Sequence, residues 1–154
     1  MLRRLALLAA ASLVLSSAAE AQVPVLDVRL GAHAVMPTGE LADGFDTGFG
    51  LYGRIGAPMG PMKLMGTLSW NRMNANSDLI DDVDVITVQV GPHFSMTPLL
   101  DFGFEAAYFS EFEELGISPN ISLALLKFEL TASYNTTFES PQASWISLGG
   151  GLRF

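Results

Sequence analysis

The feature that most constrains this chain is a two-residue alternation of apolar and polar side chains. It recurs between turn signals in eight segments, and one parity of each is free of charged residues apart from Arg72 at the end of the third segment. Successive side chains of a β-strand point to opposite faces of a sheet, so each segment predicts a strand with one apolar and one polar face. The expected strands span residues 26–35, 48–57, 63–72, 85–95, 100–109, 117–125, 128–137 and 145–154. We therefore expect an all-β fold.

The last segment carries a second signal, because its alternation of apolar and polar or glycine positions runs up to Phe154. This ending resembles the terminal strand of bacterial outer-membrane β-barrels, whose final aromatic residue and alternating apolar positions signal membrane insertion. The stretch from Gly31 to Gly39, followed by Phe45, and the run from Val90 to Phe94 also resemble the small outer-membrane barrels of the OmpA and OmpX type. The resemblance implies that the barrel-assembly machinery reads four residues of this chain. They are Leu148, Gly150, Leu152 and Phe154.

The N-terminus predicts export. Two arginines precede an apolar run over residues 5–15, and Ala19 and Ala21 provide the small residues of a cleavage site. This arrangement is typical of a secretory signal peptide, and the apolar run is too short to cross a bilayer as a helix. We expect a signal peptide at 1–21, one barrel domain at 22–154, and a location in the outer membrane.

The direction of the two faces decides between a soluble barrel and a membrane barrel. A soluble barrel such as a lipocalin places its apolar parity inside. The signal peptide, the terminal aromatic residue and the aromatic enrichment of the apolar parity favour the opposite arrangement. Aromatic residues also gather toward both strand ends, as the two girdles of a membrane barrel require. They are Trp70, Tyr108 and Tyr134 at one end and Phe94, Phe102, Phe128 and Phe154 at the other. We predict an eight-stranded antiparallel up-and-down transmembrane β-barrel.

The connections between the expected strands alternate in length, as short periplasmic turns and longer outer loops do. Short connections lie near residues 58–61, 97–99 and 126–127. The last of these, Leu126-Lys127, contains no Gly, Asn or Asp, so the boundary between the sixth and seventh strands is the one least defined by turn residues.

The polar parity places charges of both signs inside the predicted barrel. Buried charges must be paired, because an isolated one is costly to desolvate. The interior ion-pair candidates are Asp27, Arg29, Arg54, Lys63, Asp101, Glu105, Lys127, Glu129 and Arg153. Two interpretations stay open for this set: a polar plug that holds the barrel closed, or a narrow path for ions or small solutes.

The remaining acidic residues gather in or beside the long connections, so the outer mouth is expected to be strongly negative. The rim candidates are Asp78, Asp81, Asp82, Glu111, Glu113 and Glu114. Such a rim could attract cationic partners or share divalent cations with lipopolysaccharide phosphates. Calcium binding at residues 78–84 is a hypothesis only, because the segment lacks the glycine and spacing of an EF-hand loop.

One pattern suggests catalysis. His93 and Ser95 lie two residues apart, which resembles the His-x-Ser pattern of the lipid A deacylases, although no acidic residue is identifiable as the third member. We predict a non-enzymatic monomer without a cofactor, in contact with outer-membrane lipid and lipopolysaccharide, and without nucleic-acid partners. Its expected role is structural or in surface interaction. The alternatives are a narrow channel and, third, a lipid-modifying hydrolase.

Overall fold

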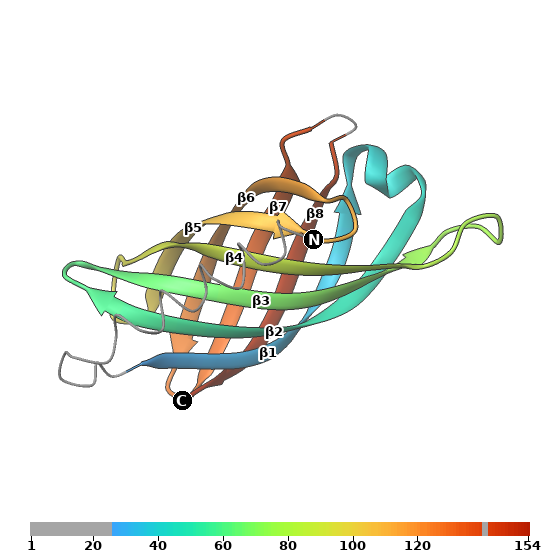
Figure 1. The fold of residues 1–154 in the computed structure, drawn as a ribbon. Helices are drawn as coiled ribbons and strands as arrows, with labels where there is room; N and C mark the ends of the chain where they lie inside the picture. Colours follow the sequence, from blue (N-terminus) through green and yellow to red (C-terminus); the bar gives the residue numbers. More distant parts are fainter. Residues whose placement is uncertain (1–25, 140–141) are drawn as a thin grey trace.

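The computed structural model describes residues 26–139 and 142–154, and within them eight antiparallel strands form a closed barrel (Figure 1). The strands follow one another around the wall in sequence order, and β1 pairs with β8 from Arg29↔Arg153 to Thr38↔Ser144. Their bounds are β1 Asp27–Thr38, β2 Phe45–Met59, β3 Met62–Ala75, β4 Val83–Ser95, β5 Leu100–Phe109, β6 Glu114–Leu125, β7 Phe128–Thr137 and β8 Ser144–Arg153. The predicted fold class is confirmed.

The predicted signal peptide at 1–21, with Ala19 and Ala21, lies outside the described residues. Within the described part, no helix has the length and apolar character needed to cross a membrane. One short 3-10 helix, η1 (Gly39–Asp43), follows β1.

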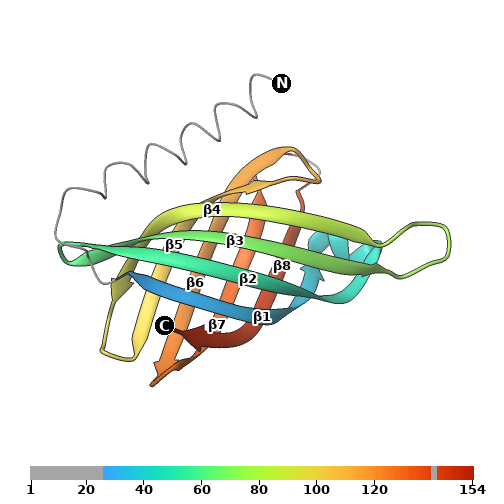
Figure 2. The ribbon, with the colours of Figure 1, turned by 60° about the horizontal axis from the view of Figure 1, so that its bottom comes forward.

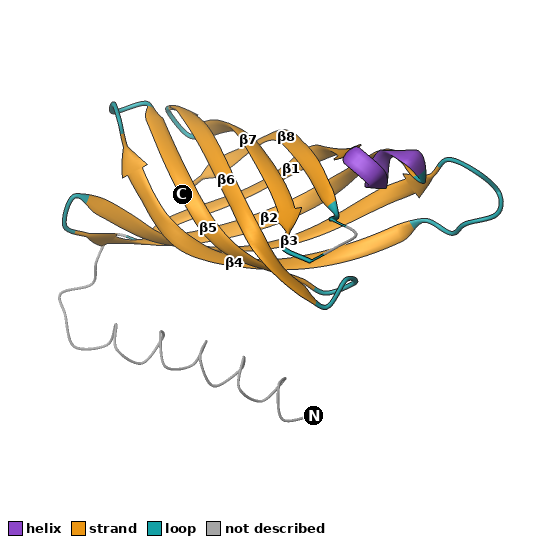
Figure 3. Ribbon diagram, turned by 90° about the horizontal axis from the view of Figure 1, so that it is seen from above, coloured by secondary structure: helices purple, strands orange, loops and turns teal. Residues whose placement is uncertain are grey.

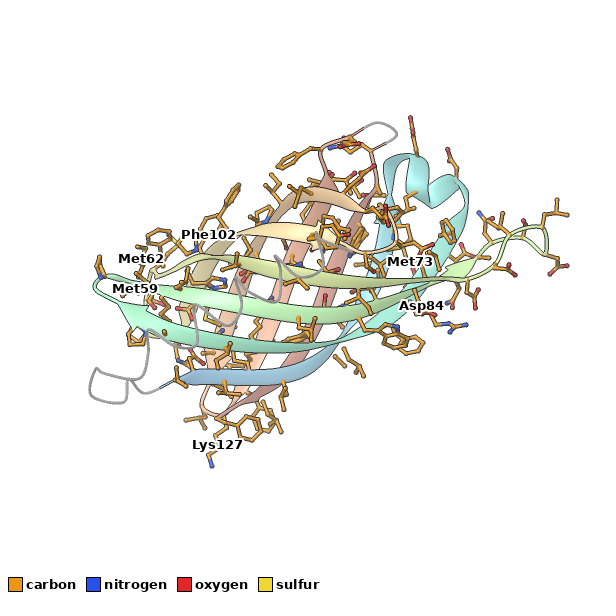
Figure 4. All side chains as sticks on the ribbon, viewed as in Figure 1. Met59, Met62, Met73, Asp84, Phe102 and Lys127 are labelled. Atoms are coloured by element: carbon orange, nitrogen blue, oxygen red, sulfur yellow. The ribbon has the colours of Figure 1, made fainter. Side chains whose placement is uncertain are left out.

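The apolar parity faces outward on all eight strands, and Figure 4 shows one of its members, Phe102, on the outside of the barrel. Leu30 and Leu68, for example, are 55% and 59% exposed, whereas Arg29 and Glu105 on the opposite parity are fully buried inside the barrel. A soluble barrel has the reverse arrangement. The outward apolar belt is therefore the surface that a membrane barrel presents to lipid.

The strand that carries the proposed insertion signal follows the same rule. Leu148 and Leu152 face outward and are 47% and 44% exposed, and Gly150 lies between them on the same parity. Phe154, the residue after β8, is also exposed.

All eight predicted strands are present, but several extend further than the apolar alternation does. β2 begins at Phe45 and β3 ends at Ala75, and these two residues pair. The extra residues at this end, which include the pair Asp46↔Asn74, continue the ladder of paired strands beyond the apolar belt. Figures 2 and 3 show the resulting asymmetry, with the β3–β4 connection projecting from one end of the barrel beside η1.

The two ends of the barrel differ in their connections. We call the end with the β1–β2, β3–β4, β5–β6 and β7–β8 connections the loop end, and the other the turn end. The turn end holds three short connections, of which Gly60-Pro61 and Leu126-Lys127 have two residues. Leu126 adopts φ 58°, a left-handed conformation that glycine or asparagine would adopt at lower cost. The boundary between β6 and β7 thus falls where it was predicted, without a turn residue to mark it.

Candidate functional site

The interior at the turn end is an ionic cluster organised around Arg29 of β1. Its guanidinium donates to Glu129 at 2.6 Å, to Asp27 at 2.7 Å and to Asp101 at 3.0 Å. All four side chains are buried. One cation therefore joins strands β1, β5 and β7 across the lumen.

Two further cations complete this cluster. Lys63 lies 3.2 Å from Asp101 and 3.5 Å from Asp27, and Arg153 donates to Asp27 at 2.9 Å. Together with Arg29 and its three carboxylates they form six charges, three of each sign. These residues meet because each lies within three residues of the end of its strand that faces the turn end, and because each side chain points inward. The mutual attraction of these charges offsets part of the free energy that their burial costs.

Two predicted members of the ion-pair set have other partners. Arg54 forms no ion pair with any described carboxylate. It donates to Ser122 and Thr131, each at 3.3 Å, and its guanidinium lies 5.0 Å from the centre of the Tyr52 ring. Glu105 accepts from Thr67 at 3.1 Å and contacts His93 Nε2 at 2.7 Å, so no lysine or arginine pairs with it in the described structure.

The prediction that Lys127 lies in the interior is wrong. Lys127 is the second residue of the β6–β7 turn, it is exposed, and it forms no ion pair with any described residue (Figure 4). A two-residue turn interrupts the alternation of the flanking strands, so parity counted through it assigns the wrong face.

A polar layer fills the middle of the barrel. His33 Nε2 lies 2.7 Å from Asn71 Oδ1, and Gln89 donates to Asn135 at 3.1 Å. The cavity in this layer has a volume of about 10 Å³. That is room for about one water molecule.

An apolar plug closes the interior at the loop end, and sequence reasoning missed it. Its buried residues are Val35, Met73, Val85, Ala107, Phe109 and Trp145. Trp145 packs edge-on against Phe109 with ring centres 5.0 Å apart. The two-residue alternation does place these residues on the inward face of their strands. They were missed because apolar residues were expected only on the outward face.

The described lumen therefore consists of an ionic cluster, a polar layer and an apolar plug. The cavity of the polar layer has room for about one water molecule, and the layers on either side of it are built from buried side chains. The polar-plug interpretation fits this geometry better than the narrow channel does.

Purified wild-type protein is expected to give no stepwise conductance in planar bilayers, because the plug and the ionic cluster each block the lumen. The measurement is single-channel recording after the boiled and unboiled samples have been compared on a gel to establish folding. Reproducible current steps from the folded sample, absent from a detergent-only control, would contradict the closed lumen.

The acidic rim lies at the loop end, as the position of its connections requires. Asp78 and Asp81 are exposed in the β3–β4 connection, and Glu111 and Glu113 are exposed in the β5–β6 connection. Glu114 differs from the expectation: it is the first residue of β6, half-buried, on the inward parity.

Asp82 is held in place by its neighbours. Its carboxylate accepts from the Ala75 N–H at 2.9 Å and from Arg72 at 2.8 Å. These two contacts lower the pKa of Asp82 below its ordinary value, the backbone donor having the larger effect. Across residues 26–139 and 142–154 no group of three His, Asp or Glu side chains is arranged to hold a metal ion.

The His-x-Ser pattern does not form a catalytic pair in this structure. Ser95 donates to Asp101 at 2.6 Å, while His93 contacts Glu105. Glu105 is an acidic partner that the sequence did not identify, yet the serine that a nucleophilic mechanism needs is bonded elsewhere.

Comparison with known proteins shows which solved structures have a similar fold. No family model matches the chain, and no curated protein matches it. Among solved structures, Ail, the attachment invasion locus protein of Yersinia pestis, has a TM-score of 0.56 at 17% identity, covering 84% of this chain and 97% of that one. Neisserial surface protein A has a TM-score of 0.51 at 12% identity, covering 84% and 97%. A designed transmembrane β-barrel has a TM-score of 0.55 at 14% identity, covering 86% and 98%.

The closed barrel, its outward apolar belt and these likenesses together define the class of protein. The chain has the fold of a small eight-stranded outer-membrane β-barrel.

Proposed function

We propose that this chain is a non-enzymatic, monomeric outer-membrane barrel whose loop end binds a cationic partner at the cell surface. The filled lumen supports a role at the surface instead of transport. The insertion machinery would recognise Leu148, Gly150, Leu152 and Phe154, and membrane lipid would cover the apolar belt.

The observation that carries the proposal is the charge of the loop end. Eleven acidic residues lie in or beside the loop-end connections, against a single basic residue, Arg72. The acidic residues are Glu40, Asp43, Asp46, Asp78, Asp81, Asp82, Asp84, Glu111, Glu113, Glu114 and Glu139. Arg72 is itself paired, at 2.8 Å from Asp82 and 3.6 Å from Asp84. A concentration of one sign produces a field that attracts partners of the opposite sign.

The β3–β4 connection adds an apolar contact surface to this charge. It projects beyond the barrel (Figure 1), and Leu79 near its tip is 94% exposed. Ile80 is also exposed, and Asp78 and Asp81 flank the two apolar residues. A partner that combines basic and apolar side chains would complement both features.

The charge also argues against one class of ligand. The structure of Ail in complex with the heparin analogue sucrose octasulfate shows that protein with a polyanion, at 22% identity to this chain and a TM-score of 0.52. Sulfate groups would meet repulsion at the acidic loop end of this chain. We therefore propose a cationic partner instead of a sulfated one.

The barrel in nanodiscs of zwitterionic phosphatidylcholine is expected to bind a fluorescent oligoarginine peptide, measured by anisotropy. Binding should weaken strongly as salt rises from 0.1 M to 1 M, because the screening length falls from about 10 Å to about 3 Å. Asp78→Asn together with Asp81→Asn should weaken it, since both carboxylates are exposed and unshielded by Arg72.

The matched control is Lys127→Ala, which changes one exposed charge at the turn end and should leave peptide binding unchanged. A labelled heparin oligosaccharide should not bind. Equal binding of both probes, or no effect of the two asparagine substitutions, would overturn the proposal.

A further inference from the structure

Three methionines gather at the turn end of strands β2, β3 and β4. Met59 ends β2 and Met62 begins β3, so the two flank the Gly60-Pro61 turn, and they pair directly with each other. Figure 4 shows both at the tip of this hairpin. Met96 is the first residue after β4, the strand that pairs with β3 on its other side. The register thus adds a third thioether to the two that the sequence already places close together.

The register also places the three side chains within reach of one another. Met59 and Met62 are directly opposite, where side chains share a face and their Cβ atoms lie about 5 Å apart. Met62 also pairs with Phe94 of β4, so Met96, two residues further along, occupies the diagonal position. Diagonal neighbours lie about 7–8 Å apart, a separation that long side chains span. The three sulfur atoms can therefore approach a common point.

The methionines lie on the outer surface, where an ion can reach them. Met59 and Met96 are 50% and 69% exposed, and Met62 is half-buried. Apart from its chain neighbours, no described atom lies within 4 Å of where a Cβ on Gly60 would stand, so the space beside the turn is open. Phe94, the β4 partner of Met62, belongs to the aromatic girdle expected at the level of the headgroups. The three methionines therefore lie at the edge of the apolar belt.

An apolar role alone does not explain the choice of methionine. The outward belt consists largely of Leu, Ile, Val and Phe. Among the described residues, the outward face carries one further methionine, Met36, near the loop end of β1. Leucine has a similar volume, so what methionine adds is its flexible and polarisable sulfur. The gathering of three such side chains at one place indicates that the sulfur itself is used.

Sulfur decides the class of ligand. Thioethers are soft donors that select Cu(I), whereas Ca²⁺ and Mg²⁺ require oxygen. We propose that Met59, Met62 and Met96 bind a soft monovalent cation, Cu(I) or its analogue Ag(I), at the turn end. His33 and His93 would also suit copper, but both rings bond to other side chains inside the barrel. This inference is independent of the acidic loop end and of the partner proposed there.

The test measures Cu(I) binding by the refolded barrel in dodecylmaltoside. Cu(I) is supplied under nitrogen with ascorbate as its bicinchoninate complex, whose absorbance falls as the protein removes the ion. Wild-type protein should remove one Cu(I) per chain. Met59→Leu together with Met62→Leu should weaken binding by at least about tenfold, because two of the three sulfur ligands are lost. Leucine preserves volume and apolar character, so the double variant should fold.

The matched control is Met36→Leu, which removes a thioether from the outer surface at the other end and should leave Cu(I) binding unchanged. A mobility shift on boiling establishes that each variant is folded. A second measurement locates the ion: Ag⁺ should protect Met59, Met62 and Met96 from oxidation by hydrogen peroxide, read by peptide mass spectrometry, and should leave Met36 unprotected. An excess of Ca²⁺ should protect none of them. Equal Cu(I) binding by the wild type and the double variant, or equal protection of Met36, would overturn the proposal.

Discussion

Replacing Arg29 with alanine is expected to lower the free energy of unfolding of the barrel by about 3–5 kcal/mol, the usual cost of breaking a buried ion pair by removing one partner. The loss is large because Arg29 is fully buried and contacts Asp27, Asp101 and Glu129 within 3.0 Å. Without the guanidinium, the cluster would hold three carboxylates against two partly exposed cations. The measurement is urea unfolding in phosphatidylcholine vesicles, followed by tryptophan fluorescence and by the mobility shift on boiling.

The matched control is Arg72→Ala, which also removes an arginine paired with two carboxylates. Arg72 lies on the outer surface at the loop end and its side chain is 39% exposed. Exposed ion pairs contribute little, so this variant is expected to lose less than about 1 kcal/mol. Equal losses in the two variants would show that the buried cluster does not hold the barrel together.

A second substitution distinguishes two reasons why Arg29→Ala would destabilise the barrel: the loss of the contacts of Arg29, and the unpaired carboxylates that it leaves behind. Glu129→Gln alone should destabilise the wild-type barrel, because Glu129 accepts from both Arg29 and Tyr52. In the Arg29→Ala background the same change removes one of the uncompensated carboxylates and should restore part of the lost stability. Such coupling is the expected behaviour of neighbours that share a network. Additive losses would contradict it.

The strands were predictable because the two-residue period appears in the sequence itself. The inward direction of Asp27, Arg29 and Glu129 follows from the same period. Parity identifies a face, however, and does not identify a level along the barrel axis. Contacts across the lumen depend on the tilt and register of all eight strands, which no single segment encodes.

Arg54 illustrates that limit. It lies directly opposite Arg29 in the β1–β2 register, where two like charges would repel. The structure separates them by their partners: Arg29 contacts the carboxylates, while Arg54 contacts Ser122, Thr131 and the Tyr52 ring. The sequence shows that both arginines face the interior, but it does not show that only Arg29 contacts carboxylates.

The apolar plug was missed for a different reason. Val35, Val85 and Trp145 occupy the inward parity, which further along the same strands is polar. An expectation of polar-in and apolar-out applies to the part of the wall within the membrane. Toward the loop end the strands enclose their own small core, so inward apolar residues are required there instead.

Trp145→Ala is expected to lower the free energy of unfolding by about 3–5 kcal/mol, as truncation of a large buried aromatic residue does in protein cores. Trp145 is 1% exposed and packs against Phe109, with Phe112 at the edge of the same cluster. Removing the indole would leave a cavity beside Phe109 and Phe112, and such a cavity adds to the cost of the lost contacts. Urea unfolding measured by the gel mobility shift avoids the change in fluorescence that the substitution causes.

The chain contains its own control, because it has two tryptophans that face opposite ways. Trp70 lies on the outer surface and packs edge-on against Phe49 with ring centres 5.5 Å apart. Lipid is as apolar as the side chain it would replace, so Trp70→Ala should cost much less than Trp145→Ala. Similar costs would mean that the loop-end interior is as accessible as the outer wall, and the closed lumen would then have to be abandoned. A large difference would place the plug among the elements that hold the barrel closed. Conductance should remain absent from Trp145→Ala, because the ionic cluster around Arg29 still blocks the turn end.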